Sequence, residues 1–193
     1  GKVKKIEDDK YDAKLITLSN GIKVHVKKTN FSPNQISMSG HSWGGTSLYS
    51  EDEYDQTDNV DWVSVGGWGN FSTTELNKKM AGKQASANTY VGTDSEGVSG
   101  GCVKKDFETM LQLTYLHFTA PRKDLEAYNS NIQRSKAAMK NAELQPTTAL
   151  QDTIAKVVYN NHRRALRTKP EDLDRINYDR IIELYRERFA DAD

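Results

Sequence analysis

The sequence has a single cysteine, no net charge and no long hydrophobic run. Lys and Arg total 27, as do Asp and Glu, and no basic cluster exceeds two residues, which argues against a nucleic-acid or membrane-surface partner. No stretch approaches the roughly 20 apolar residues that a membrane span needs. Cys102 cannot form an internal disulfide bond. It follows Gly100 and Gly101 in a strand-like run, so we expect a small buried side chain rather than a reactive thiol.

Histidines are few and far apart. His25, His41, His117 and His162 are separated by 16, 76 and 45 residues. Two histidines that share a zinc ion on one helix lie about one turn apart, and no such pair and no His-x-x-Glu-His sequence is present. No Ser-His-Asp or Cys-His arrangement is recognisable either. We therefore expect structural roles: His25 exposed on a strand, His41 hydrogen-bonded at a strand end, His117 packed or capping, and His162 in a polar loop.

The hydrophobic pattern predicts strands and short helices first and a helical run afterwards. Residues 1–12 are charged, and we expect a loose N-terminal lead. Period-two patterns and turn residues predict strands at residues 13–18, 22–28, 35–43, 84–91 and 96–103, the first two joined as an Asn-Gly hairpin. Helical periodicity and capping residues predict helices at about residues 56–65, 72–81, 106–118, 122–141, 147–160 and 178–191.

This order of elements favours an α+β fold with a mainly antiparallel sheet and helices packed on one face. We expect the N-terminal hairpin at one side of this sheet and residues 35–43 as its third antiparallel strand. The last helix has the clearest apolar stripe, and we expect Ile181, Leu184 and Tyr185 to be buried. A length of 193 residues suits one domain, or one large module of a longer protein. We therefore assign residues 13–193 to a single module.

Four segments together resemble a known family. They are residues 18–24 (LSNGIKV), 41–46 (HSWGGT), 69–83 (GNFSTTELNKKMAGK) and 118–122 (FTAPR). In this order they resemble one module of the pitrilysin/insulinase family of zinc peptidases, over nearly the whole chain from about Tyr11. The last two segments resemble the family's bacterial periplasmic branch. The resemblance implies a module like that of mitochondrial processing peptidase, within a multi-module protein of the bacterial periplasm or cell envelope.

The same resemblance implies that the family's zinc site is missing. The metal-binding helix of an active copy would fall on residues 58–62, where Asp58, Asp61 and Trp62 replace the histidines and glutamate. Tryptophan cannot bind zinc, and carboxylates without imidazole make a poor zinc site. The family's third ligand, a downstream glutamate, would fall within residues 132–139, which contain no Glu. We expect no catalytic residue, metal ligand or cofactor in this chain, and zinc in the catalytic half of the parent protein.

The resemblance also suggests where a peptide would bind. In the family, extended peptides add to a sheet edge beside the metal site. The matching strand covers residues 84–90, with Ala85, Ser86, Ala87 and Asn88 as candidate contacts. The competing interpretation, which we favour, is an inner strand whose small side chains face a helix.

Two functions stay open. The first is a non-catalytic module of a zinc metalloendopeptidase, which forms part of the substrate chamber and contacts sister modules of the same polypeptide or complex. The second is a stand-alone peptide- or protein-binding module without enzymatic activity. Trp62 and Trp68 either line the chamber or pack in the core. No constellation supports an active enzyme in this chain alone.

Overall fold

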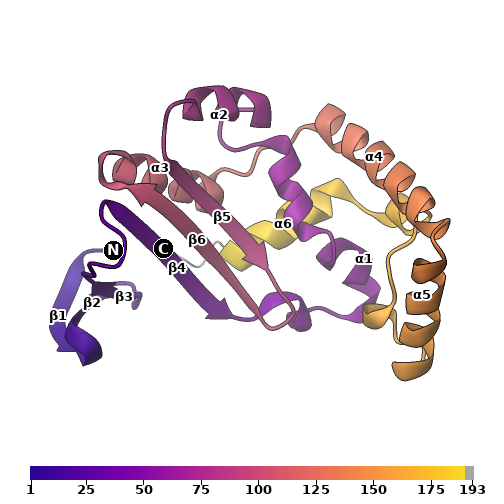
Figure 1. Cartoon of the computed structure of the whole chain (residues 1–193), viewed down its shortest axis with the longest axis horizontal. Helices are drawn as coiled ribbons and strands as arrows, with labels where there is room; N and C mark the ends of the chain where they lie inside the picture. The colour runs from indigo at the N-terminus through magenta and orange to yellow at the C-terminus, as the bar shows by residue number, and fades with distance from the viewer. Residues whose placement is uncertain (190–193) are drawn as a thin grey trace.

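The computed structural model describes residues 1–189 and has an α+β fold with two antiparallel sheets and six α-helices (Figure 1). The strands are β1 (Val3–Asp9), β2 (Ala13–Leu18), β3 (Lys23–Lys27), β4 (Gln35–Trp43), β5 (Ala85–Val91) and β6 (Ser95–Val103). The helices are α1 (Tyr54–Thr57), α2 (Thr73–Met80), α3 (Phe107–Thr119), α4 (Leu125–Glu143), α5 (Pro146–Val158) and α6 (Tyr178–Phe189). The predicted extension of the last helix to Asp191 lies outside the described residues.

The N-terminal sheet has the order β1-β2-β3. The predicted hairpin is confirmed, and the Leu18 amide closes it by donating to the Ile22 carbonyl at 2.9 Å. The expectation of a loose lead is wrong, because β1 pairs with β2 along nearly its whole length. Charged side chains do not prevent this pairing, since most of them point into solvent from both faces of the small sheet.

The second sheet has the order β4-β6-β5, and all its pairs are antiparallel. The predicted strand at residues 35–43 is confirmed, but it pairs with β6 rather than continuing the N-terminal hairpin. The favoured interpretation of the strand at residues 84–90 is wrong in one part, because β5 has β6 on one side only and is an edge strand. Its other part is confirmed, since Ala85 and Ala87 face α3. Helix α3 packs against β5 and β6, so one face of this sheet is covered by a helix, as expected (Figure 1).

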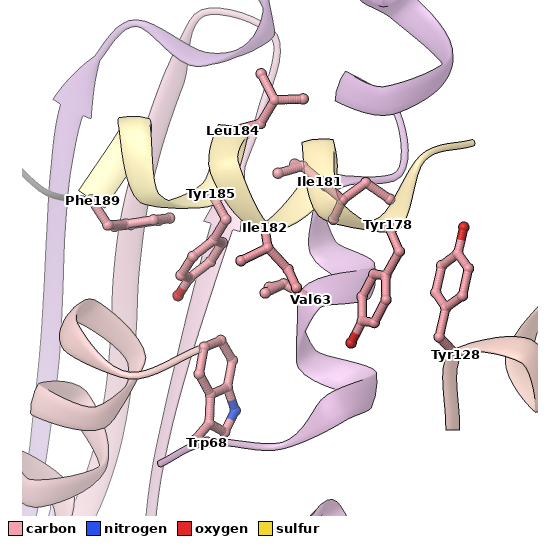
Figure 2. Close-up of a cluster of buried hydrophobic side chains, with 10 residues drawn as sticks. Val63, Trp68, Tyr128, Tyr178, Ile181, Ile182, Leu184, Tyr185 and Phe189 are labelled. Carbon is pink, nitrogen blue, oxygen red and sulfur yellow. The ribbon is translucent and has the colours of Figure 1, made fainter. Parts of the chain in front are cut away.

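The hydrophobic core surrounds α6. Ile181 is 0% exposed and Leu184 is 1% exposed, so the prediction of a buried stripe on the last helix is confirmed. Tyr185 projects from α6 towards Trp68, and Tyr128 stacks on Tyr178 at the other end (Figure 2). Complete burial of a large apolar side chain contributes about 1.5–3 kcal/mol, which makes α6 the main source of packing energy.

The predicted helix at residues 56–65 is divided into two pieces. The short α1 ends at Thr57, and a 3-10 helix, η4 (Val60–Gly66), follows it. The predicted capping box is confirmed: the Ser72 hydroxyl accepts a hydrogen bond from the Glu75 amide, and the Glu75 carboxylate accepts one from the Ser72 amide. No helix among residues 1–189 is long and apolar enough to cross a membrane.

Candidate functional site: a polar pocket at an open sheet edge

Strand β5 turns half of its main-chain groups away from the sheet. The Gly92 amide donates to the Ser95 carbonyl at 2.8 Å, which marks one hydrogen-bonded pair of the β5–β6 ladder. Such pairs alternate with non-bonded ones in an antiparallel ladder. By this register, Ala85, Ala87 and Thr89 direct their amides and carbonyls away from β6. The open edge of β5 can therefore accept a further strand.

The side chains of β5 alternate between a covered and an open face. Ala85 and Ala87 lie on the face that α3 covers, and Ala87 is buried. Ser86 and Asn88 lie on the opposite face and are exposed. The four candidate residues thus lie on one edge strand, two of them facing α3 and two facing solvent. Their contact with a peptide stays a prediction.

Two glycines fix the path of the chain from η4 to Trp68. Gly67 has a φ of +87°, which an L side chain rarely adopts. At Gly66, a Cβ atom would lie 2.0 Å from the Arg122 carbonyl oxygen. The Arg122 guanidinium also donates to the Gly66 carbonyl at 2.7 Å. This close approach ends η4 and anchors Trp68 in the core.

A pocket of about 160 Å³ lies off the open edge of β5, between η4, α3 and α6. Its lining is mostly polar or aromatic, and the residues that form it are Asp61, Val63, Ser64, Trp68, Asn88, Thr89, His117 and Tyr185. Of the residues assigned from the sequence, Asp61 and Asn88 therefore meet at one pocket. The region where the family's metal helix would fall thus contributes a wall of this pocket.

His117 forms part of the inner wall. It is 6% exposed and stacks on Trp68 with a ring-centroid distance of 4.0 Å. The Tyr185 hydroxyl donates to the His117 carbonyl at 2.9 Å, and the Thr89 hydroxyl lies 2.8 Å from the Tyr185 hydroxyl and 3.3 Å from His117 Nδ1. Burial lowers the pKa of His117 to about 4, so this imidazole is neutral at pH 7. Burial raises the pKa of Tyr185, which is therefore neutral as well.

Among the described residues, Asp61 supplies the only carboxylate of the pocket lining. It lies in the first turn of η4 with its side chain exposed at the rim. Burial of the part that faces the protein raises its pKa, and a hydrogen bond from the Val91 amide partly opposes this shift. The other two residues that the sequence analysis assigned to this region, Asp58 and Trp62, do not line the pocket. Asp58 accepts a hydrogen bond from Thr168 at 3.0 Å, and Trp62 packs edge-on against Tyr128.

These residues do not fit a zinc ion. The pocket offers one carboxylate and one imidazole, whereas protein zinc sites use three or four ligands. The His117 ring is also held against Trp68 by stacking. Across residues 1–189, no three His, Cys, Asp or Glu side chains gather in a way that could hold a metal ion. We therefore derive no metal-dependent step for this chain.

The remaining histidines and the cysteine have structural surroundings. His25 is exposed on β3, and its Nδ1 lies 2.6 Å from an Asp9 carboxylate oxygen. His41 is exposed on β4, and its ring meets Trp43 edge-on instead of making the expected side-chain hydrogen bond within the described residues. His162 accepts a hydrogen bond from the Arg164 amide in a loop. Cys102 is buried, which raises its thiol pKa and makes it less reactive.

The sequence does not predict that the side chains of His117, Thr89 and Tyr185 lie next to one another. One signal was available, because Met110, Leu113 and His117 are spaced three and four residues apart and share the buried face of α3. A histidine on such a face needs a polar partner. The partners themselves come from β5 and α6, which lie far away in the sequence, so no local pattern identifies them.

Comparison of this sequence with protein-family models gives no match, and neither does comparison with curated proteins. Comparison of structures gives many matches. One is the periplasmic protease PqqL from Escherichia coli, with a TM-score of 0.78 and 16% identity over 98% of this chain and 21% of PqqL. Another is a mutant of the ferredoxin protease FusC in complex with Arabidopsis ferredoxin, with a TM-score of 0.76 and 15% identity over 97% of this chain and 21% of FusC.

A protease from Helicobacter pylori matches with a TM-score of 0.67 and 12% identity over 97% of this chain and 44% of the protease. The chain thus spans about a fifth of the length of PqqL and FusC and less than half of the Helicobacter protease. At these identities the likeness concerns the fold. The predicted fold class is confirmed: this chain has the α+β fold of pitrilysin/insulinase-type protease modules.

Proposed function

We propose that this chain is a non-catalytic module of a zinc metalloendopeptidase of the pitrilysin/insulinase family. In this proposal it forms part of the substrate chamber and contacts sister modules, while zinc and peptide hydrolysis belong to the catalytic half of the parent protein. The parent would act in the bacterial periplasm or cell envelope. The description of PqqL as a periplasmic protease supports that location.

The observation that carries this proposal is the pocket at the degenerate metal helix. Its fold context is that of a protease module, yet its lining provides one carboxylate and a neutral, stacked histidine. A water molecule cannot be activated there by the family's zinc chemistry, which requires a set of metal ligands and a base. The open edge of β5 borders the same pocket and suits a role in holding a peptide.

An exposed apolar stripe on α5 supports contact with sister modules. Leu150, Ile154, Val157 and Val158 recur at helical spacing and are all more than half exposed. No residue of α5 is buried. An apolar stripe of this kind is typical of a surface that packs against another protein element.

The experiment that tests the proposal compares the longer parent protein with and without this segment in a peptide-cleavage assay. We expect cleavage to be lost on deletion, and to survive Asp58→Asn with Asp61→Asn on peptides that lack basic residues. Ile154→Glu with Val157→Glu should lower cleavage by weakening contacts between modules, while Lys156→Glu on the opposite side of α5 serves as the matched control.

Two outcomes would contradict the proposal. Unchanged cleavage after deletion would favour the alternative, a stand-alone peptide- or protein-binding module. A fall in turnover of about a hundredfold or more in the double aspartate variant, with melting temperature unchanged, would mean that this module takes part in the chemistry, because such a loss corresponds to nearly 3 kcal/mol of transition-state stabilisation.

A further inference from the structure

The described residues that line the pocket beside β5 include one carboxylate and no basic side chain that is charged at pH 7. Asp61 supplies the one carboxylate among the described lining residues, and burial keeps the His117 imidazole and the Tyr185 hydroxyl neutral at pH 7. No Lys or Arg is among the described residues that line the pocket. A carboxylate held at a pocket rim without a cation attracts one from outside.

We propose that this pocket binds the basic side chain, Lys or Arg, of an extended peptide lying along the open edge of β5. This inference rests on the proposed role in a substrate chamber and adds the class of peptide that the chamber wall recognises. The pocket would therefore select peptide segments by charge, without taking part in their cleavage.

The size of the pocket fits one side chain. Sites for drug-sized molecules enclose about 300–1,000 Å³, whereas this pocket encloses about 160 Å³. A long unbranched side chain can enter such a space, while a second one cannot. Its head group would meet the Asp61 carboxylate at the rim, and the Ser64 and Thr89 hydroxyl groups offer further oxygen acceptors.

The position of the pocket fits a strand paired with β5. An added strand lies about 4.8 Å from its neighbour, and its side chains alternate between the two faces. The outward main-chain groups of Ala85 and Ala87 are available to hold it, and within residues 1–189 no other element is hydrogen-bonded to them. The pocket begins at Asn88 and Thr89, next to these groups. One side chain of the added strand is then directed at Asp61.

The experiment measures binding of short fluorescein-labelled peptides of Ala and Thr that differ only at a central residue, which is Arg, Lys, Gln or Glu. The full 193-residue chain is titrated into each peptide. We expect the Arg and Lys peptides to bind at least about tenfold more tightly than the Gln peptide, as one charge-assisted hydrogen-bonded pair allows. The Glu peptide should bind least.

The variant Asp61→Asn keeps the shape of the side chain and removes its charge, so the preference for Arg over Gln should fall to about one. Asp58→Asn, which changes a neighbouring aspartate outside the pocket, should keep the full preference. Ser64→Arg places a cation at the pocket, which should repel the basic side chain of the peptide and so abolish the preference. Melting temperatures of the variants establish that each is folded.

Equal binding of the Arg and Gln peptides, undetectable binding of the Arg peptide, or a preference that persists in both Asp61→Asn and Ser64→Arg would overturn the inference. None of these results affects the proposed function, which depends on loss of cleavage when the segment is deleted. The opposite combination is also informative. If the chain prefers basic peptides but its deletion leaves cleavage unchanged, the inference about the pocket stands and the proposed role in the peptidase is refuted.

Discussion

The N-terminal sheet and the core around α6 are built on opposite principles. No residue of β1, β2 or β3 is buried, and even the apolar Val24 of β3 is 37% exposed. Helix α6 buries six of its residues: Tyr178, Ile181, Ile182, Leu184, Tyr185 and Phe189. Figure 1 shows the small sheet at one end of the molecule and α6 at its centre. Folding energy is thus concentrated in one region, while the other depends on main-chain pairing.

The concentration of packing around α6 also determines the geometry of the pocket. Tyr185 and Trp68 belong both to the hydrophobic core and to the pocket lining. Their rings are fixed by close neighbours on several sides (Figure 2). A pocket whose walls are core residues keeps its shape without a ligand, which lowers the entropy that binding must overcome.

The largest effect is expected in α6. Leu184→Ala should lower the free energy of unfolding by about 2–5 kcal/mol, because the side chain is almost wholly enclosed and its removal leaves a cavity. Urea denaturation followed by circular dichroism measures this loss. Leu150→Ala in α5 is the matched control, since the same truncation there removes a side chain that is 61% exposed, and its effect should stay below about 0.5 kcal/mol. Equal losses in the two variants would contradict the assignment of the core.

The second-largest effect is the loss of stability that the buried His117 causes at low pH. The folded protein holds this pKa at about 4, whereas an unfolded chain gives a histidine its ordinary value near 6.5. Between these values the unfolded state binds more protons, so stability falls as the pH decreases from about 6.5 to 4. The full contribution of this residue is up to about 3 kcal/mol.

His117→Gln should remove this part of the pH dependence, although it lowers stability at pH 7 by disturbing the contact with Trp68. Unfolding free energies at pH 7, 5.5 and 4.5 for wild type and variant measure the difference in slope. His41→Gln is the control, because His41 is exposed on β4 and its replacement should leave the slope unchanged. A parallel decline in the His117 variant and the wild type would show that other groups cause the acid sensitivity.

The third effect is at the start of α2. Ser72→Ala removes the hydroxyl that accepts from the Glu75 amide, and we expect a loss of about 1 kcal/mol. Thr74→Ala is the control, because Thr74 lies two residues after Ser72 in the exposed first turn of α2. This variant keeps the capping box and should change stability less. Thermal unfolding by calorimetry compares the two. A Ser72 variant as stable as the Thr74 variant would mean that the capping box does not stabilise α2.

Local patterns predicted most of the elements. Alternation and turn residues identified β2 to β6, and the helical period of α6 identified its buried residues. Pairing was harder to predict. The expected sheet included the N-terminal hairpin, but β4 instead pairs with β6, more than fifty residues later. Such pairing depends on which surfaces pack together across the fold, and alternation within one strand carries no information about that choice.

The site was only partly accessible from sequence. The family resemblance located Asp61 and Asn88, which the structure brings to one pocket. The same resemblance grouped Asp58 and Trp62 with Asp61, but η4 is a 3-10 helix, in which side chains are spaced differently from those of an α-helix. Trp62 therefore turns towards Tyr128 rather than the pocket. Sequence spacing predicts a shared face only where the type of helix is known.

The smallest effect is expected in the N-terminal sheet, and it sharpens the comparison most directly. Val24 lies opposite Ile16 of β2, and its side chain is partly in water. Val24→Ala removes two methyl groups from this cross-strand pair, so the free energy of unfolding should fall by about 0.5 kcal/mol or less, against several for Leu184→Ala. Amide hydrogen exchange adds a second measurement. The amides of β1, β2 and β3 should exchange well before those of α6, because few apolar contacts oppose local opening of the small sheet. If both regions instead exchanged together, and Val24→Ala were as destabilising as a core truncation, the sheet would be coupled to the core and the contrast between the two regions would fail.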